Sequence, residues 1–220
     1  MKLIRTALVL SLAALCSLAY AADEQAMVVD KEKKTITIPA KVAPRKLEAL
    51  NEIYPIEVIA CWGAPKGQKA HETVVTFEVK PSEVHKALES MGLKPGKPAK
   101  GDDSATGPEL GIYLEFAGAD GQPRREPIEK TIVDKKTRKP LPPLKYYFTG
   151  SVSKQPNPDK PDQVYAADLT GTLICLFPVT DEVVIQSNLS MKDEPLLKLE
   201  TNKKLLPPEG TPAKLIIEVK

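Results

Sequence analysis

Histidine, cysteine and tryptophan are scarce in this chain of 220 residues, which has two histidines, three cysteines and one tryptophan. Three cysteines cannot supply the four thiolates of an iron–sulfur cluster or of a four-cysteine zinc site. The chain also has no long apolar run, since even its longest is shorter than the about 20 residues that a membrane-spanning helix needs. The sequence therefore predicts neither an iron–sulfur protein nor an integral membrane protein.

The longest apolar run belongs to an amino end with the pattern of a secretory signal peptide. Lys2 and Arg5 form a basic start, residues 7–18 an apolar core, and Ala19-Tyr20-Ala21 a cleavage site with small residues at its first and third positions. We expect a signal peptide over residues 1–21, cleaved near Ala21. The mature chain is then periplasmic or secreted.

Cleavage would change the charge of the chain. Without Lys2 and Arg5, 29 basic residues are balanced by 29 acidic ones. Basic and acidic side chains are also interspersed, as in Lys31-Glu32-Lys33-Lys34, so there is no basic stripe to neutralise phosphates. We expect a single domain over residues 22–220 that binds no nucleic acid, with a small ligand or a cell-envelope protein as its partner.

Cleavage would also remove Cys16 and leave Cys61 and Cys175 in a compartment where thiols can oxidise. A disulfide between them requires Cα atoms within about 7 Å of each other. The alternative is two separate buried thiols, since each cysteine lies in an apolar, strand-like run, IEVIACW or LICLF. The sequence leaves both interpretations open.

The 21 prolines and the apolar segments divide the chain into loops and strands. Proline-rich stretches predict loops, at residues 94–109, 139–145, 154–163 and 206–214. Strand-length runs rich in Val, Ile, Tyr and Phe lie between them, at residues 35–39, 56–62, 73–80, 111–116, 145–149, 164–167, 173–177 and 215–219. This pattern predicts a sheet-dominated protein.

One principal helix is expected at about residues 81–91, because Pro81 suits a first helical turn and Gly92 ends the element. Val84, Leu88 and their neighbours form an apolar face at helical spacing. A weaker pattern suggests a short helix at residues 45–51. We expect an α+β fold, mainly β, with a mostly antiparallel sheet, this helix packed on it and long Pro-rich loops.

The run AADLTGTLICLF predicts a hairpin, because Gly171 can adopt the left-handed conformation of a tight turn. Val164 and Leu173 would then lie on neighbouring antiparallel strands.

Three segments resemble a known family. They are GQKAHETVVTFEVKPSEVHKALESMGLKPG, LKYYFTGS and VYAADLTGTLICLF, within roughly Ala26 to Phe177. Together they are similar to the YdjY-like domain family of exported bacterial proteins. The resemblance implies export but no established biochemical activity. Some members are linked to ferredoxin-type iron–sulfur proteins, a role for which this chain has too few cysteines. No cofactor is expected.

His71-Glu72 is the most conspicuous polar pair. The HExxH pattern of zinc hydrolases needs a second histidine at position 75, which is Val75 here. On a strand, His71 and Glu72 would also point to opposite faces. The pair alone therefore predicts neither a metal site nor a catalytic site.

Two weak chemical alternatives use the same residues. Cys61 and His71 would lie close if the strands on either side of WGAPKGQKA formed a hairpin, which suggests a hydrolase-type enzyme. Cys61, His71, His85 and Cys175 have the ligand types of a metal or redox accessory protein, but their spacing matches no metal motif. A partly buried, hydrogen-bonded His85 is the simpler interpretation.

The loop WGAPKGQKAH offers a third candidate. Gly63 and Gly67 permit tight turns that expose amide groups, and Lys66, Lys69 and His71 can hold an anion. We therefore consider a ligand-binding site formed by Gly63, Lys66, Gly67, Lys69, His71 and Glu72, beside the alternative of an ordinary solvated loop. The leading hypothesis is an exported, non-catalytic binding or accessory domain.

Overall fold

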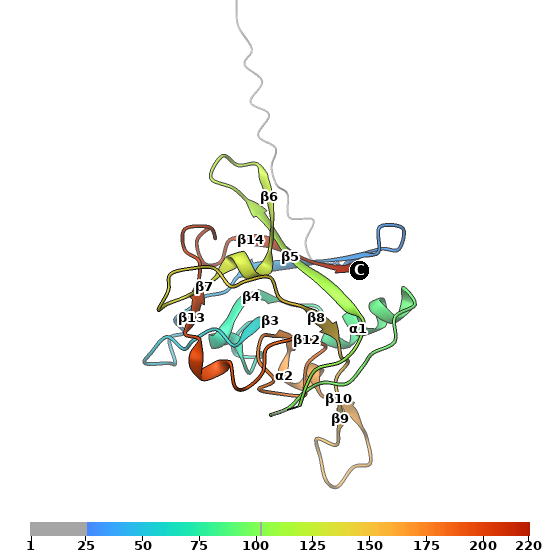
Figure 1. The fold of residues 1–220 in the computed structure, drawn as a ribbon. Helices are drawn as coiled ribbons and strands as arrows, with labels where there is room; N and C mark the ends of the chain where they lie inside the picture. Colours follow the sequence, from blue (N-terminus) through green and yellow to red (C-terminus); the bar gives the residue numbers. More distant parts are fainter. Residues whose placement is uncertain (1–25, 102) are drawn as a thin grey trace, which may run out of the picture.

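The structure is a computed structural model that describes residues 26–101 and 103–220, so the predicted signal peptide lies outside the described residues. The strands are β1 (Val28–Asp30), β2 (Thr35–Val42), β3 (Val58–Trp62), β4 (Thr73–Phe77), β5 (Glu109–Ala117), β6 (Pro123–Pro127), β7 (Ile132–Asp134), β8 (Tyr146–Phe148), β9 (Ser153–Lys154), β10 (Val164–Tyr165), β11 (Thr172–Cys175), β12 (Ile185–Ser187), β13 (Leu199–Thr201) and β14 (Pro212–Val219) (Figure 1). The helices are α1 (Pro81–Ser90), α2 (Ala167–Thr170) and the 3-10 turns η1 (Ala70–Glu72), η2 (Ile128–Thr131) and η3 (Glu194–Leu196).

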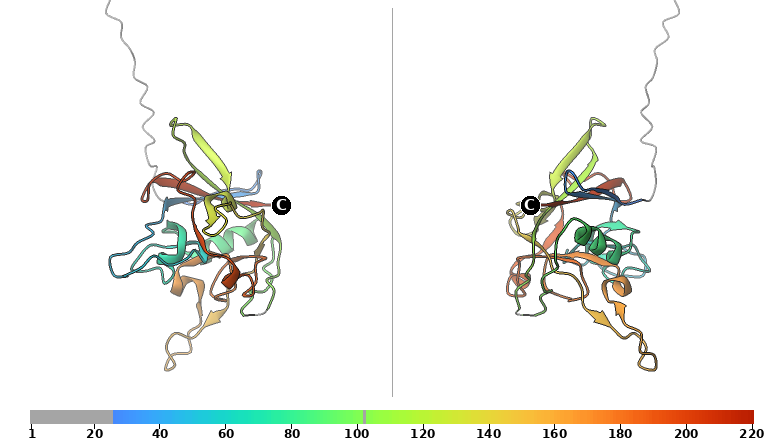
Figure 2. Two further views of the ribbon diagram at one scale, coloured as in Figure 1. Left: turned by 60° about the vertical axis from the view of Figure 1, so that its left-hand side comes forward. Right: turned by 90° about the vertical axis from the view of Figure 1, so that its right-hand side faces the viewer.

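The main sheet closes on itself. Its strands follow the order β2-β14-β5-β8-β12-β11-β3-β4, and β4 pairs back with β2 to complete an eight-stranded barrel. β1 extends the sheet beside β2, and β6 forms a protruding hairpin with β5 (Figures 1 and 2). The prediction of a mainly β fold with one principal helix is confirmed. The predicted mostly antiparallel sheet is an incomplete description, because the sheet closes into a barrel.

Two pairs of adjacent strands in the barrel, β3–β4 and β11–β12, are parallel. The hairpin considered between the strands near Cys61 and Thr73 is therefore absent. A parallel pair requires the chain to return to the same end of the sheet. The loop that follows β3 makes this return and re-enters the sheet through η1.

The predicted hairpin between Val164 and Leu173 is also wrong. Residues 167–170 form the short helix α2, while β10 pairs with β9 and β11 pairs with β3 and β12. Gly171 adopts the expected left-handed conformation, with φ at 71°, but it ends a helix instead of closing a hairpin.

Residues 45–51 form turns, and the short helix suggested there is absent. The buried guanidinium of Arg45 donates hydrogen bonds to the carbonyl oxygens of Tyr54, His71 and Thr73. These contacts fix the start of the segment to the backbone of residues 54, 71 and 73, which explains why the segment does not form a helix.

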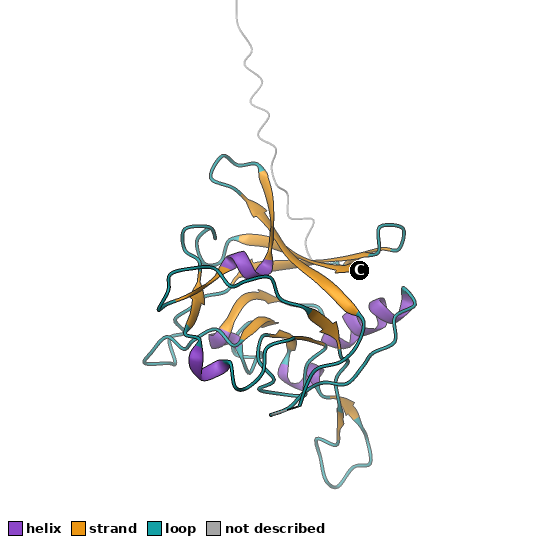
Figure 3. Ribbon diagram, in the orientation of Figure 1, coloured by secondary structure: helices purple, strands orange, loops and turns teal. Residues whose placement is uncertain are grey.

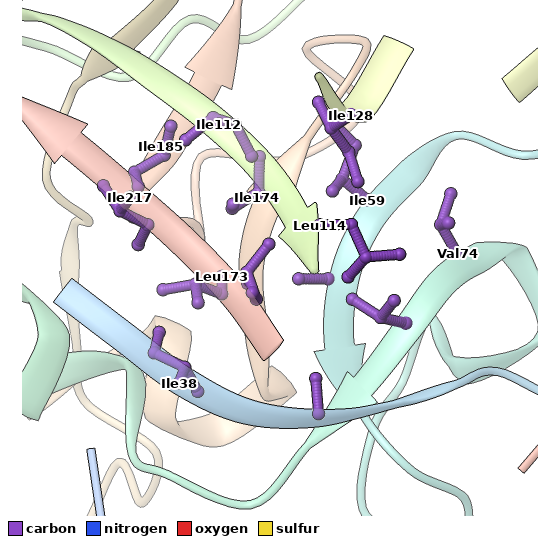
Figure 4. Close-up of a cluster of buried hydrophobic side chains, with 14 of the residues drawn as sticks. Ile38, Ile59, Val74, Ile112, Leu114, Ile128, Leu173, Ile174, Ile185 and Ile217 are labelled. Carbon is purple, nitrogen blue, oxygen red and sulfur yellow. The ribbon is translucent and has the colours of Figure 1, made fainter. Parts of the chain in front are cut away.

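The core fills the inside of the barrel. Alternate residues of β2 are buried, as its TITI pattern predicts. Ile38, Ile59, Val74, Leu114 and Ile217 come from five strands, and their side chains gather in the space between the strands (Figure 4). The Pro-rich stretches are loops over most of their length and run along the outside (Figure 3).

The predicted principal helix is confirmed as α1. Val84, Ala87 and Leu88 are buried and pack against the barrel core, as expected from their spacing. The other face of α1 points away from the core and lies next to α2 (Figure 2, right).

A separate finding concerns membranes. None of the helices in the described ranges combines the length and the apolar character needed to cross a bilayer.

Candidate functional site

The loop between β3 and β4 gathers four charged or titratable side chains. Lys69 Nζ lies 2.7 Å from Glu72 Oε2 and 3.5 Å from Glu57 Oε2, and His71 Nε2 lies 3.1 Å from Glu72 Oε1. Glu57 and Glu72 are neighbours because the parallel register pairs the residues that follow them, Val58 and Thr73. The expectation that His71 and Glu72 point to opposite faces of a strand is wrong, because both belong to η1.

Lys69 is the cation that joins the two carboxylates. Burial, followed by the negative charge of Glu72, raises the pKa of Glu57 above its usual value. Burial lowers the pKa of Lys69, but its hydrogen bonds and charge interactions with Glu72 and Glu57 outweigh that effect and raise the pKa. Lys69 is therefore already paired with two carboxylates of the protein, and it is a poor anchor for an external anion.

The glycines of this loop serve its packing. Gly67 is buried and donates its N–H to the carbonyl of Gly63 at 3.0 Å. A Cβ atom on Gly67 would lie 1.8 Å from the carbonyl oxygen of Trp62, so only glycine fits there. Of the residues considered for anion binding, Lys66 alone is exposed. The loop has the features of a compact structural turn.

Cys61 and Cys175 are free and fully buried. Burial raises the pKa of the Cys61 thiol and, further still, that of Cys175. In the pairing of β11 with β3, Thr172 lies opposite Cys61 and Cys175 lies opposite Val58. The two cysteines therefore do not face each other across the sheet, and the disulfide that the sequence left open is absent.

The structure also separates the four residues considered for a metal. His71 lies in the loop before β4, whereas His85 lies on α1 against the rings of Phe148 and Tyr165. Over residues 26–101 and 103–220, no three His, Cys, Asp or Glu side chains are grouped in a way that could hold a metal ion.

A hollow on the described surface lies beside α1. It measures about 370 Å³, and we call it the α1 groove; its lining residues are Ser82, His85, Lys86, Glu89, Tyr165 and Asp168. The four residues from α1 follow the i, i+3, i+4, i+7 spacing of one helix face, opposite the apolar face. Tyr165 and Asp168 come from β10 and α2, so tertiary structure builds the groove.

Asp168 caps the amino end of α1 from outside the helix. Its Oδ1 accepts the backbone N–H of Ser82 at 2.8 Å, and its Oδ2 accepts the Ser82 hydroxyl at 2.5 Å. Lys80, the residue before the helix, provides no side-chain cap. A carboxylate at this position satisfies a free N–H group and interacts favourably with the positive end of the helix dipole.

A chain of hydrogen bonds crosses the floor of the α1 groove. The Ser151 N–H donates to the Tyr165 hydroxyl at 3.0 Å, and that hydroxyl lies 2.7 Å from His85 Nδ1. His85 Nε2 lies 3.4 Å from Glu89 Oε1. Burial, with the charges of Asp168 and Glu89, raises the pKa of Tyr165 well above its usual value. The hydroxyl therefore stays protonated and can donate to His85.

Parts of all three segments that carry the family resemblance meet at this groove. PSEVH supplies Ser82 and His85, FTGS supplies Ser151, and VYAAD supplies Tyr165 and Asp168. A family model described as YdjY domain matches residues 27–218. The chain belongs to the YdjY domain family. No curated protein and no solved structure matches it.

In this YdjY domain the FTGS segment supports the groove from behind. Gly150 has a φ of 68°, and a Cβ atom there would lie 3.3 Å from His85 Cε1 and 2.9 Å from the Pro95 side chain. The Ser151 hydroxyl accepts the N–H of Ala167 at 3.1 Å, which fixes the start of α2. The segment thereby places Tyr165 and Asp168 against α1.

Sequence reasoning missed most of this site. The expected partly buried, hydrogen-bonded His85 is confirmed, but His85 was considered for binding only as a weak metal ligand, and Ser82, Lys86, Glu89, Tyr165 and Asp168 were left out. The polar spacing along α1 is visible in the sequence and could have indicated the helical half of the groove. Nothing in the sequence indicates that residues 165–168 pack against that half.

Proposed function

We propose that this YdjY domain is an exported, non-catalytic binding module whose ligand occupies the α1 groove. The observation that carries the proposal is the groove itself, a hollow lined by polar and charged residues of which Ser82, His85, Tyr165 and Asp168 already hold one another in place. A preformed hollow with a few oriented polar groups is the usual form of a small-molecule site. Export is supported by the signal-peptide pattern of residues 1–21.

The absence of an activated nucleophile favours binding over catalysis. In the part of the chain that the structure describes, neither histidine is hydrogen-bonded to a Ser, Thr or Cys side chain. The Ser82 hydroxyl donates its hydrogen bond to Asp168 and not to His85, so His85 is not placed to activate Ser82 as a nucleophile. Cys61 is fully buried and its raised pKa keeps it a thiol, so the hydrolase alternative with His71 gains no support.

The test is a ligand screen read by amide chemical shifts of the purified protein. A panel of sugars, amines, amino acids, carboxylates and nucleotides covers the main small-ligand classes. We expect at least one class to shift the amides of residues 82–89 and 165–168. Shifts confined to other parts of the protein, or a complete lack of shifts, contradict the proposal.

A pair of variants on α1 makes the test specific to the groove. Lys86→Trp places a large ring over the groove and should abolish the shifts. Glu83→Trp is the matched control, because Glu83 is exposed on the same helix but does not line the groove. Equal loss of binding in both variants counts against the α1 groove as the site.

A further inference from the structure

The charges of the α1 groove are not neutralised within the protein. Ion pairs within 4.0 Å do form at other places on the surface, for example Arg125 with Glu218 and Lys220 with Glu109. In the groove, Asp168 accepts hydrogen bonds only from the neutral N–H and hydroxyl of Ser82. Among the described residues, Asp168 has no cationic partner.

The other two charged side chains of the groove, Glu89 and Lys86, also lack a partner of permanent opposite charge. Glu89 contacts only His85, at 3.4 Å, and about half of its side chain is exposed. Lys86 makes no ion pair with any described residue. The groove therefore holds two carboxylates and one ammonium group whose charges remain available to a ligand.

Two of these charges share the hollow with an aromatic ring, since Asp168, Glu89 and Tyr165 all line it. The Tyr165 hydroxyl itself is occupied by Ser151 and His85. A hollow that combines an aromatic ring with two carboxylates is a favourable environment for an organic ammonium group. A ligand with only this group would leave Lys86 unpaired.

We propose that the α1 groove binds a small zwitterion, with its ammonium group between Asp168 and Glu89 and its carboxylate on Lys86. This inference rests on the proposed binding function and names its ligand class. The volume of about 370 Å³ lies at the low end of the range for small-molecule sites, about 300–1,000 Å³, and suits a ligand of amino-acid size.

The decisive experiment compares a zwitterion with its two halves. The purified protein is titrated with 4-aminobutyrate, butylamine and butyrate, and the shifts of amides 82–89 and 165–168 are measured. We expect the zwitterion to bind about tenfold or more tightly than either half, because it alone engages both charge types. A half that binds as tightly as the zwitterion overturns the inference.

Three charge-removing variants locate each end of the ligand. Glu89→Gln, Asp168→Asn and Lys86→Gln should each weaken 4-aminobutyrate binding about tenfold. Asp168→Asn retains an oxygen that can accept the Ser82 N–H, so the cap of α1 survives. Glu83→Gln, outside the groove, is the matched control and should leave the affinity unchanged. Unchanged affinity in the three groove variants overturns the inference.

The outcomes separate the inference from the function on which it rests. If only neutral sugars or simple carboxylic acids shift the groove amides, the zwitterion inference is overturned and the proposed binding function is retained. A panel in which no compound shifts these amides overturns both.

Discussion

At the scale of single residues, Glu57 and Glu72 form an unfavourable contact between like charges. Their places at the start of two parallel strands bring like charges together in a partly buried position. Burial and the charge of Glu72 together outweigh the attraction of Lys69, so the pKa of Glu57 remains raised. The folded protein therefore disfavours the charged form of Glu57.

Glu57→Gln should consequently stabilise the protein at neutral pH. A raised folded-state pKa means that Glu57 favours folding at low pH and that this contribution is lost as the pH rises through the folded-state value. The free energy of unfolding of Glu57→Gln should exceed that of the wild type at pH 7. The gain should vanish below the unfolded-state pKa, about 4.3. Urea unfolding at both pH values measures the difference.

Glu78→Gln is the control for this change, because Glu78 is exposed next to β4. It should alter the stability by less than about 0.5 kcal/mol at either pH. A loss of stability in Glu57→Gln at pH 7 contradicts the account of this cluster.

The two buried thiols lead to a second prediction for individual residues. Cys61 and Cys175 should resist a thiol reagent in the native protein and react rapidly once urea unfolds it, because both are fully buried with raised pKa values. Mass spectrometry of labelled peptides distinguishes the two sites. Rapid native labelling of Cys61 that is slowed by His71→Ala revives the nucleophile hypothesis.

At the scale of elements, α1 depends on a cap from another part of the chain. Asp168→Ala removes both acceptors of Ser82 and should lower the free energy of unfolding by about 1 kcal/mol, within the about 0.5–2 kcal/mol typical of helix caps. Asp159→Ala, in the exposed loop between β9 and β10, is the control and should have little effect. Urea denaturation compares them, and equal losses argue against the cap.

The end of α2 provides a second prediction for an element. Gly171 has a φ of 71°, and a Cβ atom there would lie 2.7 Å from the Trp62 side chain. Gly171→Ala should cost about 1–2 kcal/mol for the left-handed backbone. Displacing the ring should add about 1–3 kcal/mol.

Gly210→Ala separates these two costs. Gly210 has a φ of 82°, but nothing lies within 4 Å of the position that a Cβ atom would take there, so only the backbone cost applies. The difference in unfolding free energy between the two variants measures the contact with Trp62. Equal destabilisation shows that the ring moves aside without cost.

At the scale of the whole molecule, β14 joins two parts of the barrel. It pairs with β2 along one edge and with β5 along the other, and its Leu215 and Ile217 are fully buried. Burying such side chains contributes about 1.5–3 kcal/mol each, against a typical domain stability of about 5–15 kcal/mol. The barrel cannot close without this strand.

Deletion of residues 211–220 should therefore abolish cooperative thermal unfolding, followed by circular dichroism. Replacing residues 156–161, which are exposed in the loop between β9 and β10, with a Gly-Ser linker is the control and should preserve a cooperative transition. A deletion variant that still unfolds cooperatively contradicts the role assigned to β14.

Local patterns determined much of this protein. The alternation in TITI, the apolar face of α1 and the proline-rich loops follow from periods of two and 3.6 residues and from the restricted backbone of proline. The family could be predicted in the same way, because each segment that indicates it is continuous in the sequence. These features need only neighbouring residues.

Tertiary structure decided which segments meet. The sequence has no signal for the parallel pairing of β3 with β4, which replaces the hairpin considered there with a crossover and brings Glu57 beside Glu72. Nor does it show that Asp168 and Tyr165 pack on α1, some 80 residues away along the chain. Pairing between distant segments depends on closing the barrel around one core, so the α1 groove exists only in the folded molecule.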